Sequence, residues 1–136
     1  MFVQLIIATN VAALLRRFAY MHQAPTSDDI PELTPEQLKQ RLETGEPLTL
    51  LDVREPFEWD VANLAPQGAR LVPLGELPDC MDQLDRDADI VLYCRTGGRS
   101  KGAARHLRAH GFARVWNLKG GITAWANQLD PDMPTY

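Results

Sequence analysis

The chain has 136 residues, of which 45% are hydrophobic, and this size suits one compact domain. Its formal net charge of -4 gives no general attraction for phosphate, which argues against a nucleic-acid binder. Its two cysteines, Cys80 and Cys94, form no Cys-x-x-Cys zinc pair, and we expect neither a metal nor a cofactor. Two cysteines are also too few for a disulfide framework, so we expect a reducing, cytoplasmic location.

Residues 1–21 are predicted to form a helical extension outside the main domain. The stretch from Met1 to Leu15 is largely apolar and is followed by Arg16 and Arg17. It is shorter than the ~20 residues of a membrane-spanning helix, and it lacks the leading positive charge of a secretory signal. We expect it to pack on the domain, contact a partner protein, rest on a membrane surface or stay disordered. Residues 22–31 are polar and rich in chain breakers, which predicts a linker to a single domain over residues 32–136.

The domain alternates between helical and strand patterns. Thr34-Pro35-Glu36-Gln37 is a capping box with proline at the first helical position, and Gly45 ends that helix. Nearly continuous apolar runs predict buried strands at residues 48–53 and 90–93. Further strands are predicted at residues 70–72 and 115–118, and further helices at 78–84, 100–110 and 122–129. This alternation predicts an α/β fold with a parallel sheet and helices on both faces.

The loop after the strand at residues 90–93 carries the strongest chemical signal. In open parallel sheets, ligands bind where strands end and helices begin, and Cys94 directly follows this strand. Gly97 and Gly98 allow the loop to turn its backbone N–H groups inward, which makes a cradle for an anion. The competing interpretation is an inert core cysteine, but packing alone does not need two glycines, two arginines and a hydroxyl in the next six positions.

Cys94 is expected to be an ionised and accessible nucleophile. The inward amides, the N-terminal end of the next helix and the cations Arg95 and Arg99 should all lower the pKa of its thiol. The same cradle can hold an anionic donor such as thiosulfate or a negatively charged persulfide, and the Thr96 hydroxyl can donate to its terminal sulfur. By contrast, His106 and His110 are interpreted as surface residues, and Cys80 as a packing or surface residue.

From residue 30 to residue 136 the sequence resembles the rhodanese family. The matching elements are Leu51-Asp52-Val53-Arg54-Glu55 with Glu58, Val72-Pro73-Leu74 with Glu76-Leu77, the loop from Cys94 to Ser100, and Leu118-x-Gly120-Gly121-x-x-x-Trp125. Related phosphatases and arsenate reductases have five residues between cysteine and arginine, whereas four separate Cys94 from Arg99. The smaller ring suits sulfur better than a phosphate-sized group.

The resemblance implies a rhodanese-like fold and a sulfurtransferase in which Cys94 takes a sulfane sulfur as a persulfide and passes it on. The donor would be thiosulfate or a persulfide, and the acceptor a thiol, cyanide or a sulfur-carrier protein. The last acceptor is suggested by residues 129–136, which are similar to the tail of rhodanese domains fused to enzymes that activate sulfur-carrier proteins. Two alternatives stay open: a phosphatase or arsenate reductase of the same fold, and a non-catalytic binding module.

The family pattern also implies roles for individual residues. The substrate-binding set is Arg95, Thr96, Gly97, Gly98, Arg99 and Ser100. Asp52, Arg54 and Glu58 should support the site through a charge network, although an ordinary exposed ion pair would be worth at most ~1 kcal/mol. The segment from Ala62 to Ala69 departs from the family pattern and should border the pocket, which leaves the identity of the acceptor open.

Overall fold

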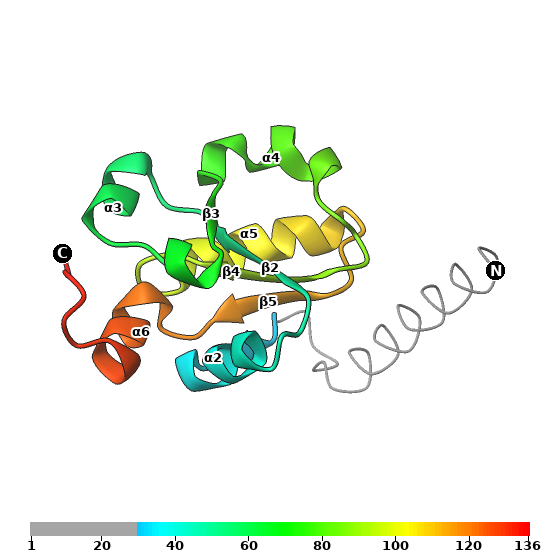
Figure 1. The fold of residues 1–136 in the computed structure, drawn as a ribbon. Coiled ribbons are helices and arrows are strands. Elements are labelled where there is room, and N and C mark those ends of the chain that lie inside the picture. Colours follow the sequence, from blue (N-terminus) through cyan, green and yellow to red (C-terminus); the bar gives the residue numbers. More distant parts are fainter. Residues whose placement is uncertain (1–29) are drawn as a thin grey trace.

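The computed structural model describes residues 30–136 as a five-stranded sheet with helices on both faces (Figure 1). The helix predicted over residues 1–21 and most of the predicted linker lie outside the described residues. All neighbouring strands are parallel, in the order β1-β5-β4-β2-β3. The strands are β1 (Glu32–Leu33), β2 (Leu48–Asp52), β3 (Arg70–Leu71), β4 (Asp89–Tyr93) and β5 (Val115–Leu118). The predicted α/β parallel-sheet fold is therefore confirmed.

Two hydrophobic clusters cover the two faces of the sheet. One contains side chains from α4 and α5, and the other contains side chains from α2 and α6. In Figure 1, α4 and α5 accordingly lie on the opposite side of the sheet from α2 and α6. The α-helices are α2 (Pro35–Glu43), α3 (Pro56–Val61), α4 (Leu77–Cys80), α5 (Gly98–Ala109) and α6 (Gly121–Leu129), and the short 3-10 helices are η1 (Ala65–Gln67), η2 (Leu74–Glu76) and η3 (Met81–Gln83).

The capping signal at Thr34 produces the start of α2 as predicted. The Thr34 hydroxyl accepts from the Gln37 amide at 3.1 Å, and the Gln37 side chain accepts from the Thr34 amide at 2.9 Å. These two bonds satisfy amides that an uncapped helix start would leave without partners. The helix then buries Leu38 completely against the sheet.

The neighbouring strands β2 and β4 bring the Asp52–Arg54 motif and the Cys94 loop to the same edge of the sheet. Their register pairs Leu48 with Asp89 and, at the other end, Asp52 with Tyr93. Because the strands are parallel, their carboxyl ends meet at one edge. The residues after β2 and the loop after β4 are therefore neighbours.

Several predicted boundaries need correction. Ile30 is buried in the core and the Pro31 carbonyl accepts from the Asn117 amide at 3.0 Å, so the last two residues of the predicted linker belong to the packed domain. Helix α5 begins at Gly98 rather than at residue 100, and the helix predicted at 78–84 is divided between α4 and η3. Neither β1 nor α3 was predicted, because each is too short to show a hydrophobic period.

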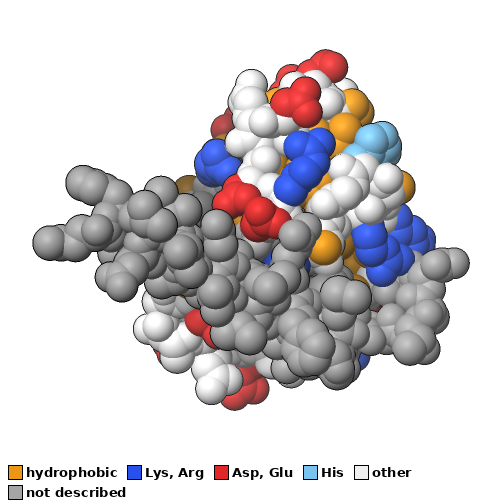
Figure 2. All heavy atoms as spheres, turned by 90° about the vertical axis from the view of Figure 1, so that its right-hand side faces the viewer, with side chains coloured by type: hydrophobic (Ala, Val, Ile, Leu, Met, Phe, Trp, Pro, Cys, Tyr) orange, Lys and Arg blue, Asp and Glu red, His pale blue; other side chains and the backbone are white. Residues whose placement is uncertain are grey.

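The described residues show mixed charges on the face drawn in Figure 2 and contain no membrane-spanning helix. Figure 2 shows acidic, basic and hydrophobic side chains interspersed over the described portion of one face. Between residues 30 and 136, no helix has both the length and the apolar character needed to cross a bilayer.

Candidate active site

Hydrogen-bond donors converge on the sulfur of Cys94, directly after β4. The Gly97 amide lies 3.1 Å from Cys94 Sγ, the Ser100 amide 3.4 Å and the Ser100 hydroxyl 3.3 Å. Gly97 has a φ of 110°, a left-handed conformation that favours glycine, and it caps the start of α5. The sequence predicts this inward turn of the amides, and the structure contains it.

The same donors set the ionisation of Cys94. Burial raises the pKa of its thiol, but hydrogen bonds from the Ser100 hydroxyl and from the amides of Ser100, Gly97 and Thr96 outweigh burial and lower it overall. The predicted direction agrees with the structure, and the inward amides are among the predicted causes. Direct hydrogen bonds to the sulfur contribute more than the cations.

The thiol is not openly accessible, contrary to expectation. Cys94 is only 1% exposed and belongs to the core cluster that includes Leu92 and Ala103. The loop is so tight that α5 begins four residues after the cysteine and covers it. The sulfur nevertheless accepts hydrogen bonds from N–H and O–H groups, which distinguishes it from a cysteine packed among apolar groups alone.

The first carbonyls of the loop point away from the sulfur because α6 binds them. Ile122 N donates to the Cys94 carbonyl at 3.0 Å, and Thr123 N donates to the Arg95 carbonyl at 3.1 Å. This contact requires glycine at position 121, since a Cβ there would lie 2.4 Å from the Arg95 carbonyl oxygen. The Gly120-Gly121 turn thus does more than end β5: it lets the start of α6 approach the loop.

The two loop arginines have different partners. Arg99 donates to both oxygens of Glu58, at 2.7 and 2.9 Å, while its side chain remains 40% exposed. Arg95 is exposed, donates to the Tyr136 carbonyl and lies over the Tyr136 ring at 4.9 Å. Of the two predicted anion ligands, Arg99 is thus placed beside the sulfur site, whereas Arg95 is directed to the C-terminal segment. Thr96 is exposed, and Gly98 forms the first turn of α5.

Asp52 and Arg54 form a buried pair rather than an exposed one. Both side chains are 0% exposed, with Arg54 Nε 2.9 Å from Asp52 Oδ1 and Nη2 2.6 Å from Oδ2. The guanidinium also donates to the carbonyls of Glu58 and Ala62 at 3.3 and 2.8 Å. Arg54 therefore connects the end of β2 to α3 and to the residue that follows α3. Helix α3 in turn carries Glu58, which faces Arg99 of the loop.

Tyr136 completes this network and was missed in the sequence analysis. Its hydroxyl donates to Glu58 Oε2 at 2.6 Å and accepts from Arg54 Nη1 at 2.8 Å. Hydrogen bonds from Arg99 lower the pKa of Glu58 to about 2, against the opposing effect of burial, and the Tyr136 hydroxyl adds to the lowering. The predicted charge network thus extends to Arg99 and to the C-terminal segment.

The cavity beside the loop is not bordered by residues 62–69 as predicted. It has a volume of about 350 Å³ and lies between α5 and the segment from η2 to α4. His106, predicted to lie on the surface, is half-buried in its wall and contacts His110, with the ring centroids 4.4 Å apart and the rings tilted by 41°. The lining residues are Leu74, Leu77, Pro78, Gly98, Arg99, Gly102, Ala103 and His106.

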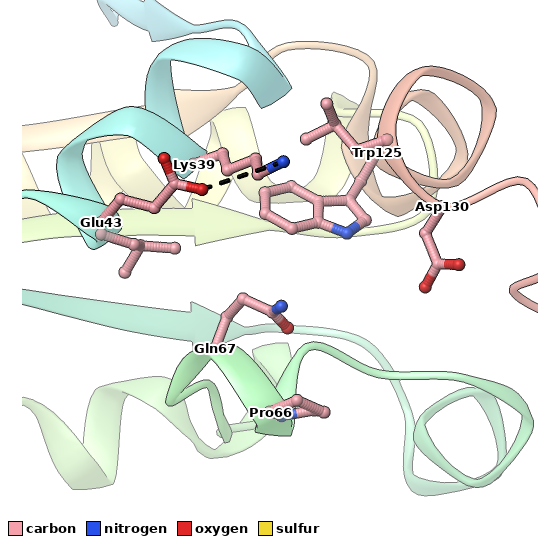
Figure 3. A pocket seen from close by; sticks show the side chains of 8 residues that line it. Lys39, Glu43, Pro66, Gln67, Trp125 and Asp130 are labelled. Carbon is pink, nitrogen blue, oxygen red and sulfur yellow. Dashed lines mark ion pairs between the residues drawn. The ribbon is translucent and has the colours of Figure 1, made fainter.

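Residues 66 and 67 instead border a second cavity, of about 450 Å³, between α2, α6 and η1 (Figure 3). Trp125 forms one wall, and the Lys39–Glu43 ion pair lies on the α2 side. None of the predicted site residues lines this cavity. Within the described residues no group of three His, Cys, Asp or Glu side chains is arranged to hold a metal ion.

Comparison with known proteins agrees with this geometry. The family profile described as "Rhodanese-like domain" matches residues 34–128. A protein named "Sulfurtransferase" from Allochromatium vinosum is 40% identical over 97 residues, covering 71% of this chain and 89% of that protein. The solution structure of a rhodanese-like domain from Anabaena sp. is 33% identical and has a TM-score of 0.65, covering 78% of each chain.

A longer relative shows the same similarity over part of its length. The protein named "Probable adenylyltransferase/sulfurtransferase MoeZ" from Mycobacterium tuberculosis is 42% identical over 106 residues. The match covers 76% of this chain but only 26% of that protein. The chain therefore spans about a quarter of this relative's length.

Proposed function

The chain belongs to the rhodanese-like domain family, whose relatives support sulfur transfer in general, and we propose that it transfers sulfur through a persulfide on Cys94. One observation carries this proposal. The Cys94 sulfur lies at the end of a parallel strand, beneath three hydrogen-bond donors from Gly97 and Ser100. Such donors favour the thiolate, which is the nucleophile in sulfur exchange.

In the first half-reaction the thiolate attacks the sulfane sulfur of the donor. A new S–S bond forms at Cys94 while the donor's S–S bond breaks, and the leaving group takes the electron pair, as sulfite when the donor is thiosulfate. In the second half-reaction an acceptor nucleophile attacks the outer sulfur, and the Cys94 thiolate leaves. Each half-reaction is a displacement at sulfur and needs no external oxidant or reductant.

The surroundings of the loop suit such a negatively charged intermediate. The amides that stabilise the thiolate lie within reach of a persulfide, and Arg99 provides a cation whose side chain is 40% exposed. Arg99 and Gly98 also line the cavity of about 350 Å³, so we take this cavity as the approach for donor and acceptor. We assign Cys94 as the nucleophile, residues 96–100 as the binding loop, and Asp52, Arg54 and Glu58 as its support.

The donor is proposed to be thiosulfate or a persulfide, and the acceptor a thiol, cyanide or a sulfur-carrier protein. The sulfur-carrier acceptor is supported by the similarity to the adenylyltransferase/sulfurtransferase relative. A thiol that must cycle through a persulfide needs reducing surroundings, so we propose a cytoplasmic location.

Intact mass spectrometry after incubation with thiosulfate tests the proposal. We expect the protein to gain the mass of one sulfur atom and to lose it again on addition of cyanide. Cys94→Ser should abolish the gain, whereas Cys80→Ser, which removes the other cysteine, should retain it. A gain that persists in Cys94→Ser, or hydrolysis of an aryl phosphate with no gain in the wild type, would refute the assignment.

A further inference from the structure

Asn117 is a buried polar residue in a strand that is otherwise largely apolar. It lies in β5, is 1% exposed and has the buried Leu118 as its neighbour. Its side chain makes three hydrogen bonds. Nδ2 donates to the Gly97 carbonyl at 3.0 Å and to Glu32 Oε2 at 3.1 Å, and Oδ1 accepts from the Ser100 hydroxyl at 2.5 Å.

These partners fix the orientation of the Asn117 amide. Nδ2 faces two oxygen acceptors, one on the loop and one on β1, and a flipped amide would set Oδ1 against both of them. The amide oxygen must therefore face Ser100. Because all three groups lie in or near the core, breaking one of these bonds would leave a polar atom without a partner.

The two loop residues that Asn117 contacts both donate to the sulfur. Gly97 donates its amide to Cys94 Sγ, and Ser100 donates both its amide and its hydroxyl. The Gly97 carbonyl accepts from Asn117 Nδ2 on β5 and from the Lys101 amide of α5. A carbonyl turned the other way would face the sulfur and repel its negative charge.

We propose that Asn117 is a positioning residue of the sulfur site, which holds Gly97 and Ser100 so that their N–H and O–H groups point at an anionic Cys94. The Ser100 hydroxyl carries a single hydrogen, and Asn117 Oδ1 at 2.5 Å is a nearer acceptor for it than the Gly97 carbonyl or Cys94 Sγ, both at 3.3 Å. Asn117 Oδ1 holds the Ser100 oxygen 3.3 Å from Cys94 Sγ, so that the sulfur can share the hydroxyl hydrogen with Oδ1 when Cys94 is ionised. This inference rests on Cys94 being the reacting residue, but its test does not depend on sulfur transfer.

The test is a pH titration of the Cys94 thiolate by its ultraviolet absorbance, in the full-length Cys80→Ser protein so that one cysteine reports. Absorbance suits a sulfur that is 1% exposed, because no reagent has to reach it. We expect Asn117→Ala to raise the midpoint by about one pH unit, which lowers the ratio of thiolate to thiol at a given pH about tenfold and corresponds to about 1.4 kcal/mol. In a Ser100→Ala background the shift should be smaller, because only the Gly97 contact remains to be lost.

A matched control separates positioning from a loss of stability. Val115 is buried two residues earlier in β5, so Val115→Ala should destabilise the domain but leave the midpoint unchanged. If Asn117→Ala does not fold, Asn117→Thr keeps a residue suited to a strand and should show the same rise. An unchanged midpoint in the variant that folds overturns the proposal. A lowered midpoint also overturns it, since Asn117 would then compete with the sulfur for the Ser100 hydrogen.

Discussion

Asp52→Ala removes the only carboxylate that pairs with the buried Arg54 guanidinium among the described residues. Arg54 is 0% exposed, and burial alone would lower its pKa, but the hydrogen bonds that it donates to Asp52 and Tyr136 outweigh burial and raise the pKa above the ordinary value. An arginine does not neutralise itself by losing a proton, so the variant must bury a charge without its counter-ion. The cost of breaking such a pair is about 3–5 kcal/mol in the free energy of unfolding.

For a domain of this size, each kcal/mol shifts Tm by about 4 °C, so Asp52→Ala should lower Tm by about 12–20 °C. Urea denaturation of wild type and variant gives the free-energy difference directly. The exposed Asp82, which lies 3.7 Å from Arg86, provides the control, and Asp82→Ala should cost less than about 1 kcal/mol. If the two variants lose equal stability, the buried pair does not support the domain as we infer.

Three further predictions concern the residues around the sulfur. The pKa of Glu58 is about 2, below its ordinary 4.5. Its charge therefore stabilises the fold above pH 4.5, and this contribution disappears as the pH falls toward 2. Glu58→Gln should flatten that part of the curve of unfolding free energy against pH. Tyr136→Phe keeps the ring but removes the hydroxyl from two charged partners, which should cost about 1–3 kcal/mol in urea denaturation. Arg99→Ala should raise both the KM for thiosulfate and the pKa of Cys94. Arg95→Ala should have smaller effects on both quantities, because Arg95 binds Tyr136. Equal effects in the two variants would contradict this geometry.

The sequence was sufficient to predict those features that depend on local pattern. Nearly continuous apolar runs located β2 and β4 to within a residue, and the capping box located the start of α2. The cradle at Cys94 was also predictable, because its glycines follow a buried strand directly. Each of these signals lies within a few residues of the structure that it specifies.

Features that depend on tertiary contacts could not be predicted in this way. Arg95 turns to Tyr136, which is 41 residues away in the sequence, and Asn117 reaches the loop from a strand 20 residues after Gly97. The burial of Asp52 and Arg54 likewise depends on α3 and the C-terminal segment closing over them. The one available signal for Asn117 was a polar side chain within an apolar strand of four residues.

The depth of the Cys94 sulfur also determines which molecules can react with it. A side chain that is 1% exposed cannot collide with a bulky oxidant or a large electrophile unless the loop first moves. Small reagents that deliver or remove a single atom should therefore reach the sulfur faster than large ones. Burial therefore excludes large reagents from the thiol and protects it from oxidation.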